Sequence, residues 1–303
     1  MEHTRNDRNP HRSNKTMRRT LRREVPGTVG LLVDEEDFAA MAGYRTFIFD
    51  DHTAYLQQVD ALLAGLAAQG LHTSVALFDP EEFAEFCTAT GLDPDRPQTR
   101  ARFTAEVAAH GACVPYTGQP LALLLPVLIN EAVRQATWDC ASLLLTNLGN
   151  CAGCGQDIGR EAFERASHAL VDLLQGAGTG AHHLVCSVPA EEEQLLAVLQ
   201  VDVDDSGVPE LSEEEGAEFV TVLAAGIALE GHGGVVLRTT RTGEPDRVHG
   251  WRLDHGELVA LTSGEVFSAY CTDAETGEPV APESGVEYCA GYPVMTHRGR
   301  PHH

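Results

Sequence analysis

Five short, largely apolar stretches recur along residues 27–205, and each has the length of a β-strand. They lie at residues 28–33, 44–49, 72–78, 141–146 and 182–188. Their apolar residues are continuous rather than alternating, which is typical of strands that are buried on both faces. Segments with helical periodicity separate them. This order predicts an α/β fold with a mostly parallel sheet that helices cover on both faces.

The helical segments show apolar residues three or four positions apart and capping residues at their starts. We expect helices at residues 56–66, 80–88, 98–110, 121–135, 158–174 and 190–199. Asp79 and Asp157 precede two of them, and an Asp in this position accepts hydrogen bonds from the free amides of the first turn. Pro80 suits the first helical position because it has no amide hydrogen to leave unpaired.

The pattern changes after a polar linker at residues 202–211. A helix is expected at residues 213–229, followed by shorter strand-like runs between turn sequences at residues 233–240, 248–253, 257–261 and 286–294. We therefore predict three parts. Residues 1–26 form a disordered basic tail, residues 27–205 an α/β domain, and residues 206–303 a small C-terminal α+β module rich in strands.

Charge and hydropathy restrict the partners. The net charge is −24, but residues 1–26 carry eight basic and three acidic residues, which leaves 13 basic and 42 acidic residues elsewhere. Such an acidic body repels phosphate backbones, which argues against nucleic acid as a partner. The longest apolar run, residues 121–129, contains Pro126 and is too short to cross a bilayer. Eight cysteines without a secretory signal suggest reduced thiols in a soluble, cytoplasmic protein.

Lysine is nearly absent, and this excludes several kinds of chemistry. Of the 21 basic residues only Lys15 is a lysine, a bias typical of a high-GC bacterial gene. A P-loop nucleotide site, a protein kinase and a PLP enzyme each need a lysine inside the fold. Lys15 lies in the polar tail, so we expect neither PLP nor a P-loop nucleotide. The G-x-S-x-G and H-E-x-x-H motifs are also missing.

Acidic residues follow the predicted strands. Asp34 comes after the first strand, and Asp50, Asp51 and His52 come after the second. The carboxyl ends of parallel strands meet at one edge of a sheet, where ligands bind. Clustered carboxylates there suit Mg²⁺ or Mn²⁺ and phosphate-ester hydrolysis. The alternative is that these residues only cap the helices that follow.

A second candidate is the pair Cys151 and Cys154, separated by Ala and Gly before Gly155. Two thiolates in a tight turn suit a structural zinc ion, which needs four ligands. The pair follows a predicted strand and precedes a predicted helix, which also suits a redox dithiol. Free structural thiols are the third interpretation.

Taken together, the sequence favours a ligand-binding or regulatory protein whose site lies at the carboxyl edge of the sheet. Its partner would be a small molecule or another protein. A metal-dependent hydrolase and an interaction scaffold without a small-molecule site are the alternatives, so the sequence leaves open whether the protein is an enzyme.

Overall fold

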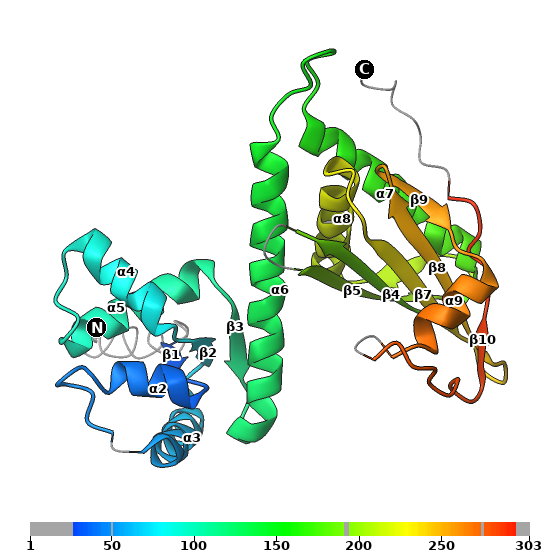
Figure 1. Ribbon diagram of the computed structural model, residues 1–303. Coiled ribbons are helices and arrows are strands. Elements are labelled where there is room, and N and C mark those ends of the chain that lie inside the picture. The colour runs from blue at the N-terminus through cyan, green and yellow to red at the C-terminus, as the bar shows by residue number, and fades with distance from the viewer. Residues whose placement is uncertain (1–26, 50, 191–193, 274–275, 295–303) are drawn as a thin grey trace, which may run out of the picture. The chain divides into compact units, whose positions relative to one another are not determined.

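The computed structural model describes residues 27–49, 51–190, 194–273 and 276–294, and Figure 1 shows its helices and strands. The chain divides into two compact units, Met1–Gln135 and Ala136–His303. The basic tail predicted at residues 1–26 lies outside the described part. The boundary expected between residues 205 and 206 falls inside the second unit, because strands on both sides of it belong to one sheet.

The first unit is built on a three-stranded sheet in the order β1 (Gly27–Leu31), β2 (Thr73–Leu77) and β3 (Cys113–Tyr116). Strands β1 and β2 are parallel, whereas β3 runs antiparallel to β2. The core around this sheet is rich in aromatic rings, and Phe83 and Leu63 at its centre are fully buried. This unit therefore has its own hydrophobic core.

In the described part of this unit, five helices pack around the sheet. They are α2 (Glu35–Met41), α3 (His52–Ala68), α4 (Pro80–Thr90), α5 (Pro97–His110) and the first part of α6 (Leu121–Asn147). Asp79 accepts hydrogen bonds from the amides of Glu81 and Glu82, as expected for the cap of α4. The Asp60 carboxylate on α3 accepts from the Leu121 amide and so fixes the start of α6.

The second unit contains a larger sheet. Its strands follow the order β10 (Val286–Tyr288), β8 (Asp246–Asp254), β7 (Gly234–Thr240), β4 (Gly180–Pro189), β5 (Gln194–Val203) and β6 (Pro209–Leu211), and β9 (Glu257–Ala260) pairs with β8. The strands of this sheet pair antiparallel except for β8 and β10, which are parallel.

Helices α7 (Ile158–Ala177) and α8 (Glu213–Ala228) pack against each other, and α8 also packs on β4 and β5 (Figure 1). The residues between them and the sheet form a second core that includes Leu184, Phe219 and Trp251. On the opposite face of β8, α9 (Ser263–Tyr270) lies close: a methyl group at Gly250 would be 3.2 Å from Val266.

An α/β class with mixed helices and sheets is correct, but the expectation of a mostly parallel sheet is not confirmed. Parallel pairing is limited to β1 with β2 and β8 with β10 among the described strands. The reason lies in residues 190–199, which were expected to form a helix. Gln194–Val203 is strand β5, whose side chains alternate between exposed and buried. A connection of a few residues from β4 returns the chain antiparallel, whereas a helix would have allowed a parallel crossover.

Two other predicted strands are also corrected. Residues 44–49 form a loop after α2, and residues 141–146 belong to α6, which continues without a break to Asn147. A short apolar run does not distinguish a strand from a buried helix by periodicity alone. Leu and Ala dominate this segment and favour a helix that continues. Within the described residues, no helix is long and apolar enough to span a membrane.

Candidate functional site

Two of the predicted acidic residues, Asp34 and Asp51, cap helices. The Asp37 amide donates to Asp34 Oδ1 at 2.8 Å, and the Ala54 amide donates to Asp51 Oδ2 at 2.8 Å. His52 begins α3, and its Nε2 lies 3.2 Å from the Leu32 carbonyl oxygen. Asp50 lies outside the described residues. The capping interpretation therefore accounts for Asp34 and Asp51.

Some of these carboxylates nevertheless share one edge of the sheet. The pKa of Asp37 is raised, first by burial and then by the charges of Asp34 and Asp79. Asp34 and Asp79 follow the parallel strands β1 and β2, which explains why both act on Asp37. No group of three or more His, Cys, Asp or Glu residues able to hold a metal occurs in the described part of the chain. Binding of Mg²⁺ or Mn²⁺ at this edge stays a prediction, because Asp50 is not described.

A different feature, the aromatic pocket, lies at the carboxyl ends of β1 and β2. It has a volume of about 200 Å³. Leu32 and Phe78, which line it, directly follow the two strands. The other lining residues come from β1, α2, the loop after α2, α3 and α5, and are Gly30, Met41, Thr46, Phe47, Phe49, Tyr55, Arg100, Ala101 and Thr104. The expected location of a site is thus occupied by an apolar cavity.

Aromatic rings in contact with one another form one wall of the pocket. The ring centroids of Phe47 and Phe49 are 5.1 Å apart, and Phe49 meets Tyr55 edge-on at 5.1 Å. The Tyr55 hydroxyl accepts a hydrogen bond from the Leu32 amide, and burial raises its pKa, so the phenol stays neutral. These rings are held in place by both packing and hydrogen bonding.

The pocket reaches the backbone of β1 at Gly30, which has no side chain. A methyl group at this position would lie 2.8 Å from Thr104 Oγ1 and 3.0 Å from the Phe78 ring. Any larger residue would fill the narrow space between β1 and α5. Glycine at this position therefore leaves this part of the cavity open.

Hydrogen bonds of Thr46 hold the loop of residues 42–49, which we call the clasp. Arg100 on α5 donates to the Thr46 hydroxyl at 3.0 Å and to its carbonyl oxygen at 3.2 Å. The Thr46 amide donates to Asp95 Oδ1 at 3.2 Å, and its hydroxyl donates to the Asp95 carbonyl at 2.7 Å. The clasp therefore closes over the pocket through a few exposed polar contacts.

The Cys151–Cys154 pair lies between α6 and α7, not between a strand and a helix. The Cys151 amide donates to the Gln156 carbonyl at 2.8 Å, and the Gly155 amide donates to the Cys151 carbonyl at 2.8 Å. The Cys154 thiol is exposed and lies 3.6 Å from Gln156 Oε1. Cys151 is partly buried. Among the described residues, the pair does not belong to a group of three or more His, Cys, Asp or Glu side chains that could hold a metal. The zinc and redox interpretations therefore stay predictions.

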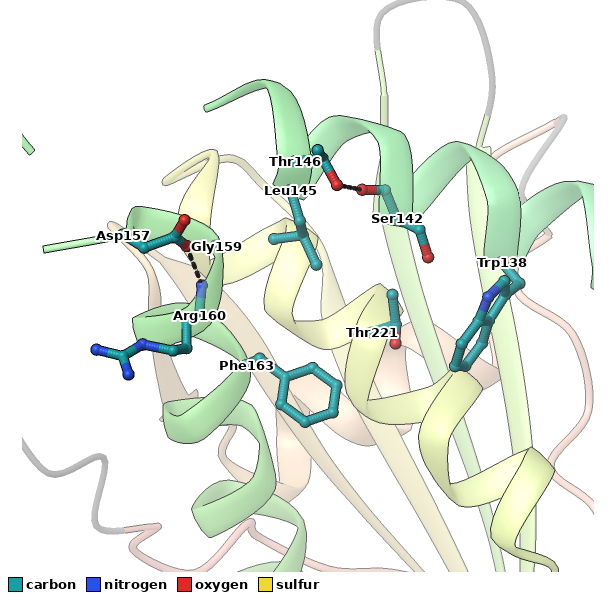
Figure 2. A pocket seen from close by; sticks show the side chains of 9 residues that line it. All are labelled: Trp138, Ser142, Leu145, Thr146, Asp157, Gly159, Arg160, Phe163 and Thr221. Atoms are coloured by element: carbon teal, nitrogen blue, oxygen red, sulfur yellow. Dashed lines mark hydrogen bonds between the residues drawn. The ribbon is translucent and has the colours of Figure 1, made fainter. Parts of the chain in front are cut away.

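The second unit contains an open groove between α6, α7 and α8, the three-helix groove, with a volume of about 480 Å³. Helix α6 contributes Trp138, Ser142, Leu145 and Thr146, helix α7 and its cap contribute Asp157, Gly159, Arg160 and Phe163, and helix α8 contributes Thr221. Figure 2 shows Trp138 and Phe163 on either side of Thr221.

The helices meet closely at one end of this groove. A methyl group at Gly159 would lie 2.7 Å from the Leu145 carbonyl oxygen. The Arg160 amide donates to Asp157 Oδ1 at 2.7 Å, which caps α7 as the sequence predicts. In Figure 2 the Arg160 guanidinium points away from the two rings.

Sequence reasoning missed both cavities, although one signal was present. Seven of the ten phenylalanines lie between residues 38 and 103. That concentration indicates an aromatic core in the first unit, but it does not show which rings border a cavity. The groove has no comparable signal, because its residues are polar and apolar side chains spread over three helices.

The comparisons with known proteins concern mainly the first unit. No curated protein and no solved structure matches the chain. Every residue that lines the aromatic pocket lies between Gly30 and Thr104. This whole stretch falls within residues 16–119, which match the model of a protein family described as a domain of unknown function (DUF8829).

Proposed function

We propose that the first unit is a ligand-binding, regulatory domain that takes up a small, neutral aromatic molecule in the aromatic pocket. The observation that carries this proposal is a cavity at the carboxyl ends of β1 and β2 that is lined by Phe47, Phe49, Tyr55 and Phe78. Ligand sites in proteins are mostly apolar cavities with a few polar groups that fix orientation. The pocket has this composition.

The size of the pocket limits the ligand. Its volume of about 200 Å³ is below the usual range for sites that bind drug-sized molecules. A single or fused aromatic ring system fits this space better than a larger molecule. Offset and edge-on contacts with the surrounding rings would add to the burial of its apolar surface.

The polar groups favour a neutral ligand and binding rather than catalysis. The Arg100 guanidinium uses both Nη atoms on Thr46, so it supports the clasp instead of facing a free carboxylate. The described lining residues include no Asp, Glu, His or Cys that would serve as a general acid, base or nucleophile. The hydroxyl of Thr104 remains as a group that can orient a ligand.

The clasp connects binding to regulation. Opening the pocket requires release of Thr46 from Arg100 and Asp95, and these contacts are exposed and therefore weak. A bound ring that packs under Phe47 and Phe49 would hold the clasp closed. The occupancy of the pocket would then set the conformation of an exposed loop that carries Ile48, a residue that is 82% exposed.

Isothermal titration calorimetry with indole tests this proposal. We expect a dissociation constant between about 10 μM and 1 mM, as suits a ligand of a few atoms. Ala101→Phe places a ring in the pocket and should weaken indole binding at least tenfold. Ala105→Phe, one turn further along α5 and exposed, is the matched control and should bind as the wild type does.

A second measurement reports on the clasp. Indole should slow hydrogen exchange of the Thr46 amide, and Arg100→Met should speed it up, whereas Arg102→Met on the exposed side of α5 should have no effect. Thr104→Leu fills the pocket from a second position. If both variants lose indole binding, misfolding of Ala101→Phe alone does not explain the loss. Absence of heat at millimolar indole, or equal binding by Ala101→Phe and the wild type, would overturn the proposal.

A further inference from the structure

The three-helix groove of the second unit presents two large aromatic side chains that lack ring partners. Phe163 is 40% exposed, and Trp138 is half-buried. Neither ring packs against another aromatic ring of the described residues, in contrast to the rings that line the aromatic pocket. Two such faces bordering one cavity of about 480 Å³ form a place where a flat ring system can stack.

The floor of the groove offers hydrogen bonds without charge. Thr221 is buried, and its hydroxyl donates to the Ala217 carbonyl at 2.8 Å, which leaves the oxygen free to accept. The Ser142 hydroxyl makes no hydrogen bond within the described residues and is able to donate or accept. A ligand that carries both a donor and an acceptor at its edge matches this pair of hydroxyls.

The charged residues lie at one end of the groove and are directed elsewhere. The Asp157 carboxylate accepts from the Arg160 amide as the cap of α7. The guanidinium of Arg160 points away from Trp138 and Phe163 in Figure 2. The space between the rings therefore suits an uncharged ligand rather than a phosphate or a carboxylate.

We propose that the three-helix groove is a second ligand site, which binds a neutral, planar nitrogen heterocycle of the purine-base class. Its ring system stacks against Trp138 and Phe163, and its ring nitrogens and exocyclic groups hydrogen-bond to the hydroxyls of Ser142 and Thr221. This site differs from the aromatic pocket in its unit, its size and its hydroxyl-lined floor, so it does not rest on the function proposed above.

Tryptophan fluorescence gives a direct test with adenine as the probe. The chain has two tryptophans, and Trp251 is 1% exposed in the core of the second unit. We expect adenine to quench the emission of Trp138 in a saturable manner. In Trp138→Phe the remaining emission comes from Trp251 and should not change with adenine.

Further variants distinguish the loss of stacking in the groove from an unspecific effect of removing an exposed ring. Phe163→Ala keeps the Trp138 reporter and should weaken adenine binding about tenfold, while Phe267→Ala, which removes a ring of similar exposure on α9, should not. Thr221→Val should weaken binding about fivefold while leaving the size of the groove unchanged. Calorimetry on Trp138→Phe measures the loss of binding when the reporter is absent.

Three results would overturn the proposal: no saturable quenching at millimolar adenine, equal weakening by Phe163→Ala and Phe267→Ala, or quenching that persists in Trp138→Phe. Ala101→Phe in the first unit should leave adenine binding unchanged. A loss of adenine binding in that variant would place adenine in the aromatic pocket and would equally overturn a separate site.

Discussion

At the scale of single residues, short polar side chains satisfy backbone groups that would otherwise be unpaired. Asp34, Asp51, Asp79 and Asp157 each accept from amides at a helix start. Each of these caps contributes about 1 kcal/mol to stability. In the larger sheet, His182 on β4 is 3% exposed and likewise hydrogen-bonds to a backbone group, the Gly178 carbonyl.

Burial favours the neutral form of the His182 imidazole in the folded protein at pH 7. Its Nε2 lies 2.9 Å from the Gly178 carbonyl and donates to it, so Nδ1, at 3.0 Å from Thr239 Oγ1, accepts from that hydroxyl. Burial is the main cause that lowers the pKa of His182 below its ordinary value of 6.5. In the unfolded chain the imidazole regains that ordinary value and binds a proton more readily.

The free energy of unfolding should therefore fall as the pH is lowered from 7 to 5. Stability from the neutral imidazole is fully present above pH 6.5 and is lost below it, because the unfolded state then binds more protons. Urea titrations followed by tryptophan fluorescence at several pH values measure this slope. His182→Gln should be less stable at pH 7 but should show a shallower slope, and His183→Gln, on the exposed side of β4, should keep the wild-type slope. Equal slopes in the wild type and His182→Gln would contradict this assignment.

At the scale of elements, the connection from α6 to α7 contains two of the eight cysteines, Cys151 and Cys154. It is shaped by backbone hydrogen bonds and by an antiparallel bridge between Asn150 and Asp157. Because both flanking elements are helices, Cys151 and Cys154 lie on an exposed turn rather than at a sheet edge. A closed zinc site here would need two ligands in addition to these two thiolates.

The zinc prediction has a measurable consequence at this turn. If zinc binds there, protein purified without chelator contains the metal, and Cys151→Ser releases it and lowers the free energy of unfolding by several kcal/mol. A redox pair instead gives a reversible disulfide with a measurable potential, and its double serine variant stays folded. Elemental analysis and thiol titration distinguish the two, with Cys113→Ser on β3 as the control. Metal-free protein with two freely titrating thiols at this turn would eliminate the zinc site.

At the scale of the whole molecule, the residues that the structure describes form two hydrophobic cores. One lies in the unit Met1–Gln135 and the other in the unit Ala136–His303. Both tryptophans belong to the second unit, so their fluorescence reports on that unit, while circular dichroism reports on both. In the second unit, Tyr292 holds the last described residues in place: its hydroxyl donates to the Leu173 carbonyl, and its own carbonyl accepts from Trp251 Nε1 at 2.8 Å.

Substitutions in one core should therefore affect one unfolding transition. Phe83→Ala empties a fully buried position in the first unit and should cost about 3–5 kcal/mol there, without moving the fluorescence transition. Gly176→Ala places a methyl group against the Tyr292 ring and should lower the fluorescence midpoint, with a cost of about 1–3 kcal/mol. Gly231→Ala, with open space around it, is the control. A single transition that both variants shift equally would show that the units unfold together.

Local patterns in the sequence determined much of the secondary structure. The starts of α4 and α7 follow from Asp79 and Asp157, because a cap acts on the next three residues only. The periodicity of α8 and the turns before β8 and β9 likewise depend on neighbouring residues. The aromatic pocket lies at the sheet edge where a ligand site was expected, and of the acidic residues named for that site Asp34 and Asp51 also cap helices.

Only the tertiary structure decided how these elements pair and which side chains meet. Residues 141–146 are as apolar as a strand, and their Leu and Ala content favours a helix only weakly; the packing of Ala141 in the core of the second unit fixes this segment as part of α6. The aromatic pocket joins residues from Gly30 to Thr104, and the groove joins Trp138 to Thr221. Contacts over such separations depend on strand direction and helix packing, which no local pattern encodes. The cavities therefore follow from the fold, whereas the helix starts follow from the sequence itself.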